Sequence, residues 1–355
     1  MTILKEKYTK VFLTGASGWL GKRIAQALTS GNEAISTVLE TKNCELKCLV
    51  PAGENIRELQ QLGATIITGD ITQPQDIERF LVDGYNGLVL HIAGIIHPPG
   101  RTTWFDKINY EGSRHILEAA TRFQTKRLVV MSSNSPTGLN SSSDHLFTED
   151  SPYSPYMGYG RSKHKMELMM RAAMKEKNSP EITIIRAPWF YGPGQPLRQT
   201  EFFTMIKQGK FPLMGKGLNK RSMAYVDSLA YGILLAANTD AAINEIFWIA
   251  DDRPYSMLEI VTTIKSVLEE DFNITCSKKN LHVPAIISDI AQCCDAFLQR
   301  IGIYQQKIHI LSEMNKTIAC DISKAKEKLN YAPLVNLREG MRHSIQWSIS
   351  NQKVM

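Results

Sequence analysis

Short apolar runs alternate with amphipathic segments through the first half of the chain. Strands are predicted at residues 10–14, 46–50, 65–68, 87–92, 127–132 and 182–187. A helical pattern separates each pair of consecutive strands, at residues 19–29, 54–62, 74–82, 104–122 and 159–175. This alternation is typical of a parallel sheet covered by helices on both faces, with ligands bound at the carboxyl ends of its strands. Residues 1–188 are therefore predicted to form a doubly wound α/β domain of the Rossmann type.

The pattern loosens after Pro188, where Gly192-Pro193-Gly194 interrupts the chain. Further helices are predicted at residues 201–208, 227–238, 257–268, 321–329 and 337–349, with strands near 223–226 and at 246–250. Residues 189–355 are expected to form a smaller, mixed C-terminal lobe that binds the substrate. The weaker alternation leaves the chain free to cross between the two lobes more than once.

The most apolar long stretch spans residues 283–303, but Asp289, Asp295, Gln299 and Arg300 interrupt it. A helix that spans a bilayer needs about 18 or more consecutive apolar residues, so no transmembrane segment is predicted. A half-buried helix is the favoured interpretation. The alternative is a surface that rests on a membrane or covers an apolar substrate.

Composition narrows the class of protein further. The 355 residues are 43% hydrophobic and 21% charged, as in ordinary soluble proteins, and the net charge of +6 is spread along the chain. That distribution suits a small anionic ligand and lacks the concentrated basic patch that nucleic acid needs. The six cysteines have no metal-site spacing, so no metal is predicted. Residues 1–7 lead into the first strand without a signal-peptide pattern, and a cytoplasmic protein is expected.

A glycine-rich turn follows the first predicted strand and opens the first helix, with the sequence Thr-Gly-Ala-Ser-Gly-Trp-Leu-Gly over residues 14–21. Glycines there permit a tight turn and let backbone N–H groups approach a pyrophosphate at the positive end of the helix. A dinucleotide is the ligand that this arrangement favours. The expected cofactor contacts are Gly15, Ser17, Gly18, Trp19, Leu20 and Gly21.

Two further groups could carry chemistry. Tyr159 and Lys163 are four residues apart and share one face of a predicted helix. An ammonium beside a phenol is expected to lower the pKa of the phenol, so that it exchanges protons near neutral pH. Ser132 and Ser133 end the fifth strand, where a hydroxyl can hold a substrate oxygen. A turn-capping serine is the alternative.

Together these groups resemble the extended short-chain dehydrogenase/reductase superfamily, in its NAD-dependent epimerase/dehydratase and 3β-hydroxysteroid dehydrogenase branch. The resemblance covers nearly the whole chain, because further segments match the family's motifs in order. These segments are Gly69-Asp70-Ile71, His91-Ile92-Ala93-Gly94, the helix around Asn109, residues 186–194, residues 221–227, residues 321–325 and Tyr331-Ala332-Pro333.

The resemblance implies roles for individual residues. Tyr159 would be the general acid/base, and Lys163 would lower its pKa and hold the nicotinamide ribose. Ser133 would hydrogen-bond the reacting oxygen; it is preferred to Ser132 because the family's catalytic hydroxyl lies five residues before the glycine found here at Gly138. Asn109 would support the site. Implied cofactor contacts also include Asp70, Ile71, Ala93, Gly94 and Pro188, and implied substrate contacts are Trp189, Phe190 and Arg221.

Departures from the family pattern limit these implications. The second strand ends in Val50-Pro51-Ala52-Gly53, without the acidic residue typical of NAD enzymes or the arginine typical of NADP enzymes. Both NAD and NADP therefore remain candidates. Asn134 stands where family dehydratases carry an acidic pair, which disfavours the elimination of water.

Three functions remain open at this point. The favoured one is an NAD(P)-dependent oxidoreductase of the 3β-hydroxysteroid dehydrogenase-like kind, which interconverts a secondary alcohol and a ketone. Trp189 and Phe190 fit an apolar substrate, or simply fill the junction between lobes. Arg221 favours the alternative, a sugar-nucleotide epimerase with tightly bound NAD. The third is a non-catalytic dinucleotide-binding protein. By resemblance, the partner is a small-molecule substrate, and a homodimer would form through helices 104–122 and 159–175.

Overall fold

The computed structural model describes residues 7–8, 10–29, 32–36 and 44–351. Within them, seven strands form one parallel sheet in the order β11-β6-β5-β4-β1-β2-β3. The strands are β1 (Lys10–Thr14), β2 (Glu45–Val50), β3 (Thr65–Thr68), β4 (Leu88–His91), β5 (Arg127–Ser133), β6 (Glu181–Ala187) and β11 (Glu245–Trp248). The strand order reverses between β1 and β4, the position at which doubly wound sheets bind ligands. The predicted Rossmann-type fold is confirmed.

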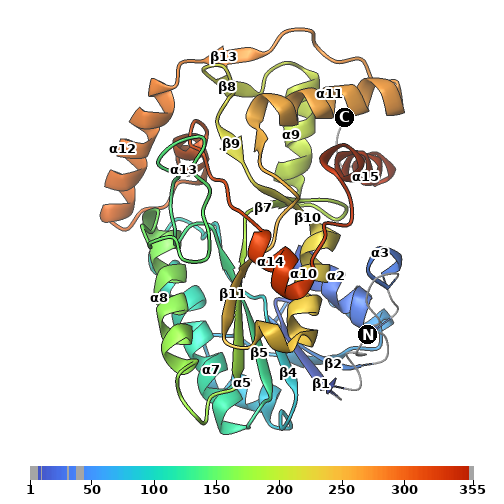
Figure 1. Ribbon diagram of the computed structural model, residues 1–355, viewed down its shortest axis with the longest axis vertical. Coiled ribbons are helices and arrows are strands. Elements are labelled where there is room, and N and C mark those ends of the chain that lie inside the picture. Colours follow the sequence, from blue (N-terminus) through green and yellow to red (C-terminus); the bar gives the residue numbers. More distant parts are fainter. Residues whose placement is uncertain (1–6, 9, 30–31, 37–43, 352–355) are drawn as a thin grey trace.

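Helices cover both faces of this sheet (Figure 1). One face packs against α2 (Trp19–Leu28), α10 (Val226–Asn238) and α14 (Ser323–Leu329), and the other against α5 (Pro74–Leu81), α7 (Gly112–Arg122) and α8 (Met157–Ala173). Of the short helices, α3 (Glu33–Ser36) packs against α10, and α4 (Arg57–Gln61) lies beside β3. The central strands are buried on both faces, which explains their continuous apolar runs in the sequence, whereas the edge strand β3 is partly exposed.

A second, smaller lobe lies beyond the carboxyl ends of the strands. Its core joins α9 (Leu197–Lys207), α11 (Met257–Phe272) and α15 (Leu337–Ser350). Short strand pairs complete it: β7 (Trp189–Tyr191) with β10 (Met223–Tyr225), β9 (Lys220–Arg221) with β12 (Tyr255–Ser256), and β8 (Pro212–Met214) with β13 (Leu281–Val283). The strands of this lobe are too short to give a clear pattern in the sequence.

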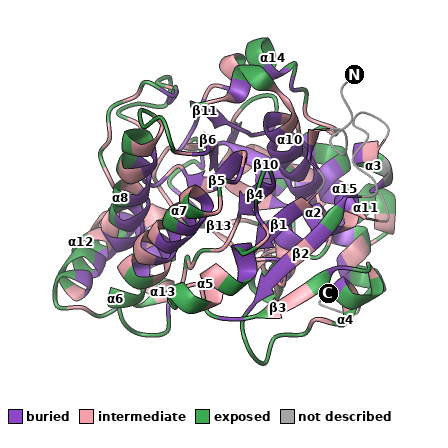
Figure 2. Cartoon of the chain, turned by 90° about the horizontal axis from the view of Figure 1, so that it is seen from below, coloured by how far each residue is buried: buried purple, intermediate pink, exposed green. Residues whose placement is uncertain are grey.

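A helical hairpin at the outer edge of the molecule joins the two lobes. It consists of α12 (Ile286–Arg300) and α13 (Gln306–Glu313), and α12 contacts α8. Figure 2 places α12 at the periphery, beside α8. The sequence predicted a helix in this region but not its partner α13.

The chain crosses between the two lobes more than once. It leaves the sheet after β6 and returns for α10 and β11, so β11 lies in the sheet and α10 packs against it. The structure corrects one expectation about the helices. The helix expected at 104–122 is interrupted, because the π-helical turn η1 (Asp106–Glu111) separates α6 (Thr103–Phe105) from α7. Wide turns of this kind often occur at functional sites.

Candidate active site

The glycine-rich turn lies at the carboxyl end of β1, against the end of β4. Gly15 has a φ of +73°, and a Cβ atom there would lie 2.8 Å from the Ala93 amide nitrogen. A Cβ atom on Gly21 would lie 2.1 Å from the Gly15 carbonyl oxygen. Both positions therefore exclude a side chain, because the turn passes so close to its neighbours.

The amino end of α2 opens from this turn. Gly18 is the N-cap and supplies no side chain to bond the first N–H groups of the helix, while its own N–H donates to Gly15 over 3.0 Å. Uncapped N–H groups and the helix dipole together attract an anion. Gly18 is exposed and Ser17 is half-buried, whereas the Leu20 side chain is packed in the core. The turn and helix end thus fit the pyrophosphate of a dinucleotide.

Trp19 connects the turn to the second lobe. Its indole N–H donates to the Pro193 carbonyl oxygen over 2.7 Å, and its ring lies 4.8 Å from that of Phe190. Trp189 packs edge-on against Phe202 at 5.4 Å. Both aromatic residues expected to contact substrate therefore contribute to packing at the lobe junction, and each stays half-buried.

Asn109 sits in the π-helical turn and is fully buried. Its amide oxygen accepts from the Ile95 N–H at 2.8 Å, and its amide nitrogen donates to the Ile95 carbonyl oxygen at 3.0 Å. The same nitrogen donates to Ser162 on α8 at 3.1 Å, and Ser162 in turn donates to the Tyr159 carbonyl oxygen. Asn109 thereby fixes the loop after β4 relative to the helix that carries Tyr159.

A second buried chain of hydrogen bonds starts from His91, which the sequence analysis placed in a family motif without assigning it a role of its own. Its two ring nitrogens lie 2.8 Å from the Thr14 and Ser113 hydroxyl oxygens. Ser113 donates to the Asn109 carbonyl oxygen, and Thr14 accepts from the Ala93 N–H. Burial lowers the pKa of His91 to about 3, and the charge of Lys163 adds to this effect. The neutral ring therefore acts as a fixed connector between β1, β4 and α7.

Tyr159, Ser133 and Lys163 come together at the carboxyl end of β5. Tyr159 is 9% exposed and packs with Phe105 and Tyr304. Burial raises its pKa to about 12, opposed by its hydrogen-bonding contact with Ser133. This direction is opposite to the lowering expected from a neighbouring ammonium, because burial dominates and the charge of Glu313 adds to it. At neutral pH the phenol is protonated and can donate a proton.

Lys163 is also buried, and its ammonium donates to the Met131 carbonyl oxygen over 2.8 Å. Burial lowers its pKa to about 8, partly offset by the charge of Glu167. Gly94 lies beside it: a Cβ atom there would be 3.3 Å from the Lys163 ammonium nitrogen and 3.1 Å from the Asn109 amide oxygen. The loop after β4 therefore passes close to both groups.

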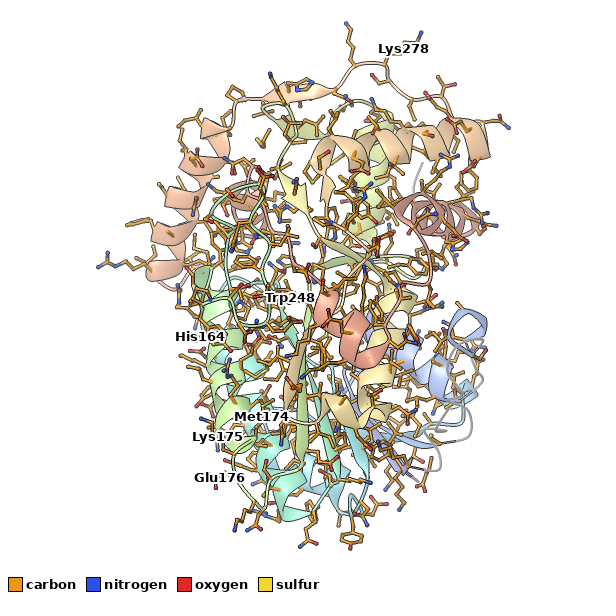
Figure 3. All side chains as sticks on the ribbon, viewed as in Figure 1. His164, Met174, Lys175, Glu176, Trp248 and Lys278 are labelled. Carbon is orange, nitrogen blue, oxygen red and sulfur yellow. The ribbon has the colours of Figure 1, made fainter. Side chains whose placement is uncertain are left out.

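Ser132 and Ser133 point in different directions, as neighbours on a strand must. Ser132 donates to the Glu167 carboxylate at 2.5 Å, within a buried cluster. Glu167 also pairs with Arg186 at 2.7 Å, and neither side chain is exposed. The Arg186 guanidinium lies over the ring of Trp248, which Figure 3 places inside the molecule near the end of β11. Ser132 is thus a structural residue, and Ser133 lies toward Tyr159.

The remaining predicted residues are distributed around this centre. Asp70 is exposed and accepts from the Thr72 N–H at 2.8 Å, and Ile71 accepts from His115. Pro188 is buried at the end of β6. Arg221 donates to the Glu313 carbonyl oxygen at the end of α13, and burial lowers its pKa.

The tip of β2 supplies no charged side chain. Residues 51–53 form an exposed turn, and Arg57 opens α4. In the part of the chain that the structure describes, no group of three or more His, Cys, Asp or Glu side chains is placed to hold a metal ion.

Residues 11–250 match the NAD-dependent epimerase/dehydratase family. The chain belongs to this family. A Sinorhizobium fredii protein described as uncharacterized protein y4nL is 50% identical over 96% of this chain and 95% of its own length. The UDP-glucose 4-epimerase of Vibrio cholerae is 25% identical over 95% of this chain and 94% of its own. The sterol-4-alpha-carboxylate 3-dehydrogenase of Schizosaccharomyces pombe is 24% identical over 91% and 96%.

A solved structure supports the same fold. The dTDP-glucose 4,6-dehydratase of Bacillus anthracis in complex with NAD aligns with a TM-score of 0.73 and 18% identity, over 97% of this chain and 98% of the other. Family members are epimerases, dehydratases and oxidoreductases that depend on a nicotinamide cofactor. The glycine-rich turn, the uncapped end of α2 and the close approach of Gly94 to Lys163 fit such a group.

Proposed function

We propose that the protein is an NAD(P)-dependent oxidoreductase that interconverts a secondary alcohol and a ketone. The observation that carries this proposal is the meeting of Ser133, Tyr159 and Lys163 at the carboxyl edge of the sheet, beside the glycine-rich turn. When bound at that turn, the cofactor supplies or accepts the hydride.

The protein's own residues handle the proton and the geometry. In ketone reduction, Tyr159 donates its phenolic proton to the substrate oxygen, and in alcohol oxidation its phenolate takes that proton. Ser133 holds the same oxygen by a hydrogen bond. Lys163 would place a positive charge beside a bound cofactor, and the Asn109 bonds keep α8 and the loop after β4 in position.

Two features support an apolar alcohol or ketone over a sugar nucleotide. The surroundings of Tyr159 are the side chains of Phe105, Tyr304 and Ile95, which offer few partners for sugar hydroxyls. Arg221, at the position that grips a diphosphate in related sugar-nucleotide enzymes, is buried and bonded to the end of α13. The sterol dehydrogenase among the relatives acts on a substrate of the favoured class.

The alternative is a sugar-nucleotide epimerase, which would use the same residues but keep its cofactor bound. The epimerase among the relatives supports this second candidate. Native mass spectrometry of the purified protein, followed by titration with NAD, NADH, NADP and NADPH, separates the two. Reversible binding of one cofactor is expected for the oxidoreductase. A tightly held NAD that copurifies would instead favour the epimerase.

We further propose a cytoplasmic homodimer formed through α7 and α8. Leu168 on α8 is 49% exposed, which supports an apolar contact there. Sedimentation analysis of a Leu168→Glu variant tests it: the variant should be a monomer where the wild type is a dimer. A wild-type monomer would contradict this assembly.

A further inference from the structure

The hairpin of α12 and α13 is anchored to the helix that carries Tyr159. The Gly158 N–H donates to the Gln299 side-chain oxygen over 2.8 Å. Gln299 also donates to Asp295, and Asp295 bonds His309 on α13 at 2.7 Å. Ser288 donates to the Ser312 carbonyl oxygen at 3.1 Å. Polar bonds therefore hold the hairpin together and to α8.

The inner side of α12 is consequently polar. Ser288 and Asp295 are fully buried and Gln299 is 5% exposed. A helix on the surface of a soluble protein ordinarily turns its apolar side inward and its polar side to water. Helix α12 has the reverse arrangement.

The outer side of α12 is apolar. Ile286, Ile290, Phe297 and Ile301 are 59%, 57%, 63% and 55% exposed, and their spacing of four, seven and four residues keeps them on one side of the helix. Cys293 and Cys294 are exposed between them. We name these six residues the α12 face. Single exposed apolar residues are common on proteins, whereas a contiguous row marks an interaction site.

A shallow apolar groove adjoins the α12 face. It is open to solvent, has a volume of about 260 Å³ and is lined by Ile287, Ile290, Ala291, Cys294, Ile308 and Leu311. Its walls come from both helices of the hairpin. The groove can receive part of a hydrocarbon chain but offers almost no polar contact.

The unpaired charges beside the α12 face are positive. Arg300 and Lys307 are exposed, and neither forms an ion pair with any residue in the described ranges. The nearby acidic groups are already engaged: Asp289 pairs with Lys316 at 2.6 Å, and Asp295 is buried against His309. The border is therefore complementary to an anionic surface.

We propose that the α12 face docks on the surface of a bilayer that contains anionic lipids. The helix would lie in the interface with its isoleucines and Phe297 among the acyl chains and with Arg300 and Lys307 at the headgroups. No helix in the described residues is long and apolar enough to cross a bilayer, so the contact is with one leaflet. A second copy of the chain fits less well, because a two-fold contact would bring equal positive borders together. The proposal does not depend on the proposed reaction.

Vesicle cosedimentation of the full chain tests this docking. The vesicles are phosphatidylcholine alone, or phosphatidylcholine mixed with phosphatidylglycerol. Wild-type protein should bind the mixed vesicles, and the double variant I290S/F297S should bind them at least about tenfold more weakly. The matched control is V82S/Y85S, which removes two side chains that are 63% and 68% exposed near the end of α5, and it should bind like the wild type. The variant R300Q/K307Q should lose the preference for anionic vesicles.

Thiol labelling gives an independent readout on the unaltered protein. Cys293 and Cys294 are exposed, whereas Cys44, Cys48, Cys276 and Cys320 are buried. Anionic vesicles should slow the reaction of the two exposed thiols with a maleimide. Absence of wild-type binding to both vesicles, or equal binding by I290S/F297S, would overturn the proposal. A dimer that forms through this face and is lost in I290S/F297S, without vesicle binding, would also overturn it and assign the face to a second copy.

Discussion

Helix α8 carries Tyr159 and Lys163, and two buried networks reach it from different parts of the molecule. On the sheet side, Glu167 bonds Arg186 and Ser132. On the hairpin side, Asp295 bonds His309 and Gln299, and Gln299 bonds the backbone of Gly158.

The two networks differ in how their positive partner responds to pH. Burial works to lower the pKa of Arg186, but Glu167 raises it above its ordinary value, so the guanidinium stays charged. Burial also works to lower the pKa of His309, and its bond to Asp295 and the charge of Glu313 raise it above the ordinary value. A histidine still titrates within reach of physiological pH. The reactive helix thus has one permanent anchor and one that responds to pH.

The substitution Tyr159→Phe separates the chemical role of α8 from the anchoring of α8 most clearly. This change removes the reacting hydroxyl and leaves both networks intact. Turnover should fall by about 10²–10⁴, because acid/base catalysis is lost, while cofactor binding and thermal stability stay close to wild type. Steady-state kinetics and cofactor titration measure this. Unchanged turnover would remove Tyr159 from the reaction.

Breaking the permanent anchor should mainly affect stability. Glu167→Ala leaves Arg186 buried without its carboxylate, and such a loss costs about 3–5 kcal/mol. Denaturant unfolding measures the cost, which should be nearly the same across the neutral pH range. A loss below about 1 kcal/mol would show that the pair does not hold α8. Glu118→Ala is the control, because Glu118 forms an exposed pair with Arg114.

Substitutions of the two adjacent serines distinguish the reactive group from the buried network that supports α8. Ser133→Ala should lower turnover by about 10²–10³, the usual cost of losing one hydrogen bond to a developing oxyanion. Ser132→Ala should instead lower stability by about 1–3 kcal/mol, because the buried Glu167 carboxylate loses a donor. Kinetics and unfolding are compared for both variants. The reverse pattern would assign the catalytic hydroxyl to Ser132.

The smallest expected effect concerns the hairpin anchor and its pH dependence. Asp295→Asn should lower stability by about 1–3 kcal/mol at acidic pH. The pKa of His309 is raised in the folded protein, so its contribution is complete below the unfolded pKa of about 6.5 and is lost as pH rises through the folded pKa. The difference between wild type and variant should therefore shrink with rising pH. Unfolding measured between pH 5 and 9 checks this sign, and a constant or growing difference would contradict it.

Most of the sheet could be predicted from the sequence, because buried parallel strands appear as short apolar runs that alternate with helical patterns. The helical spacing of Tyr159 and Lys163 and the place of Ser133 at a strand end were both visible in the sequence, and the family resemblance is what grouped the three residues into one site. The interruption of the helix at Asn109 was not predicted, and the bond that Asn109 makes there reaches Ile95 on another loop, a contact that no local pattern indicates. The direction of the Tyr159 pKa was wrong for a similar reason: burial by Phe105 and Tyr304 depends on residues distant in the sequence.

The hairpin of α12 and α13 gives a second example of a feature that depends on residues distant in the sequence. Residues 283–303 were predicted to form a half-buried helix, and α12 is one, but the sequence pattern did not show which of its sides faces inward. The polar side of α12 bonds His309 and Gly158, and both of these residues lie on other elements. Which side of an amphipathic helix faces inward depends on these long-range bonds.

The stoichiometry of cofactor use tests the proposed reaction most directly. The purified full chain is mixed with reduced cofactor and a panel of sterol-like and other apolar ketones, and the alcohol formed and the oxidised cofactor released are both quantified. One molecule of alcohol is expected for each cofactor molecule oxidised and released, and Tyr159→Phe should abolish both signals. Product formation without net oxidation of added cofactor, on a protein that retains bound NAD, would contradict it and identify an epimerase.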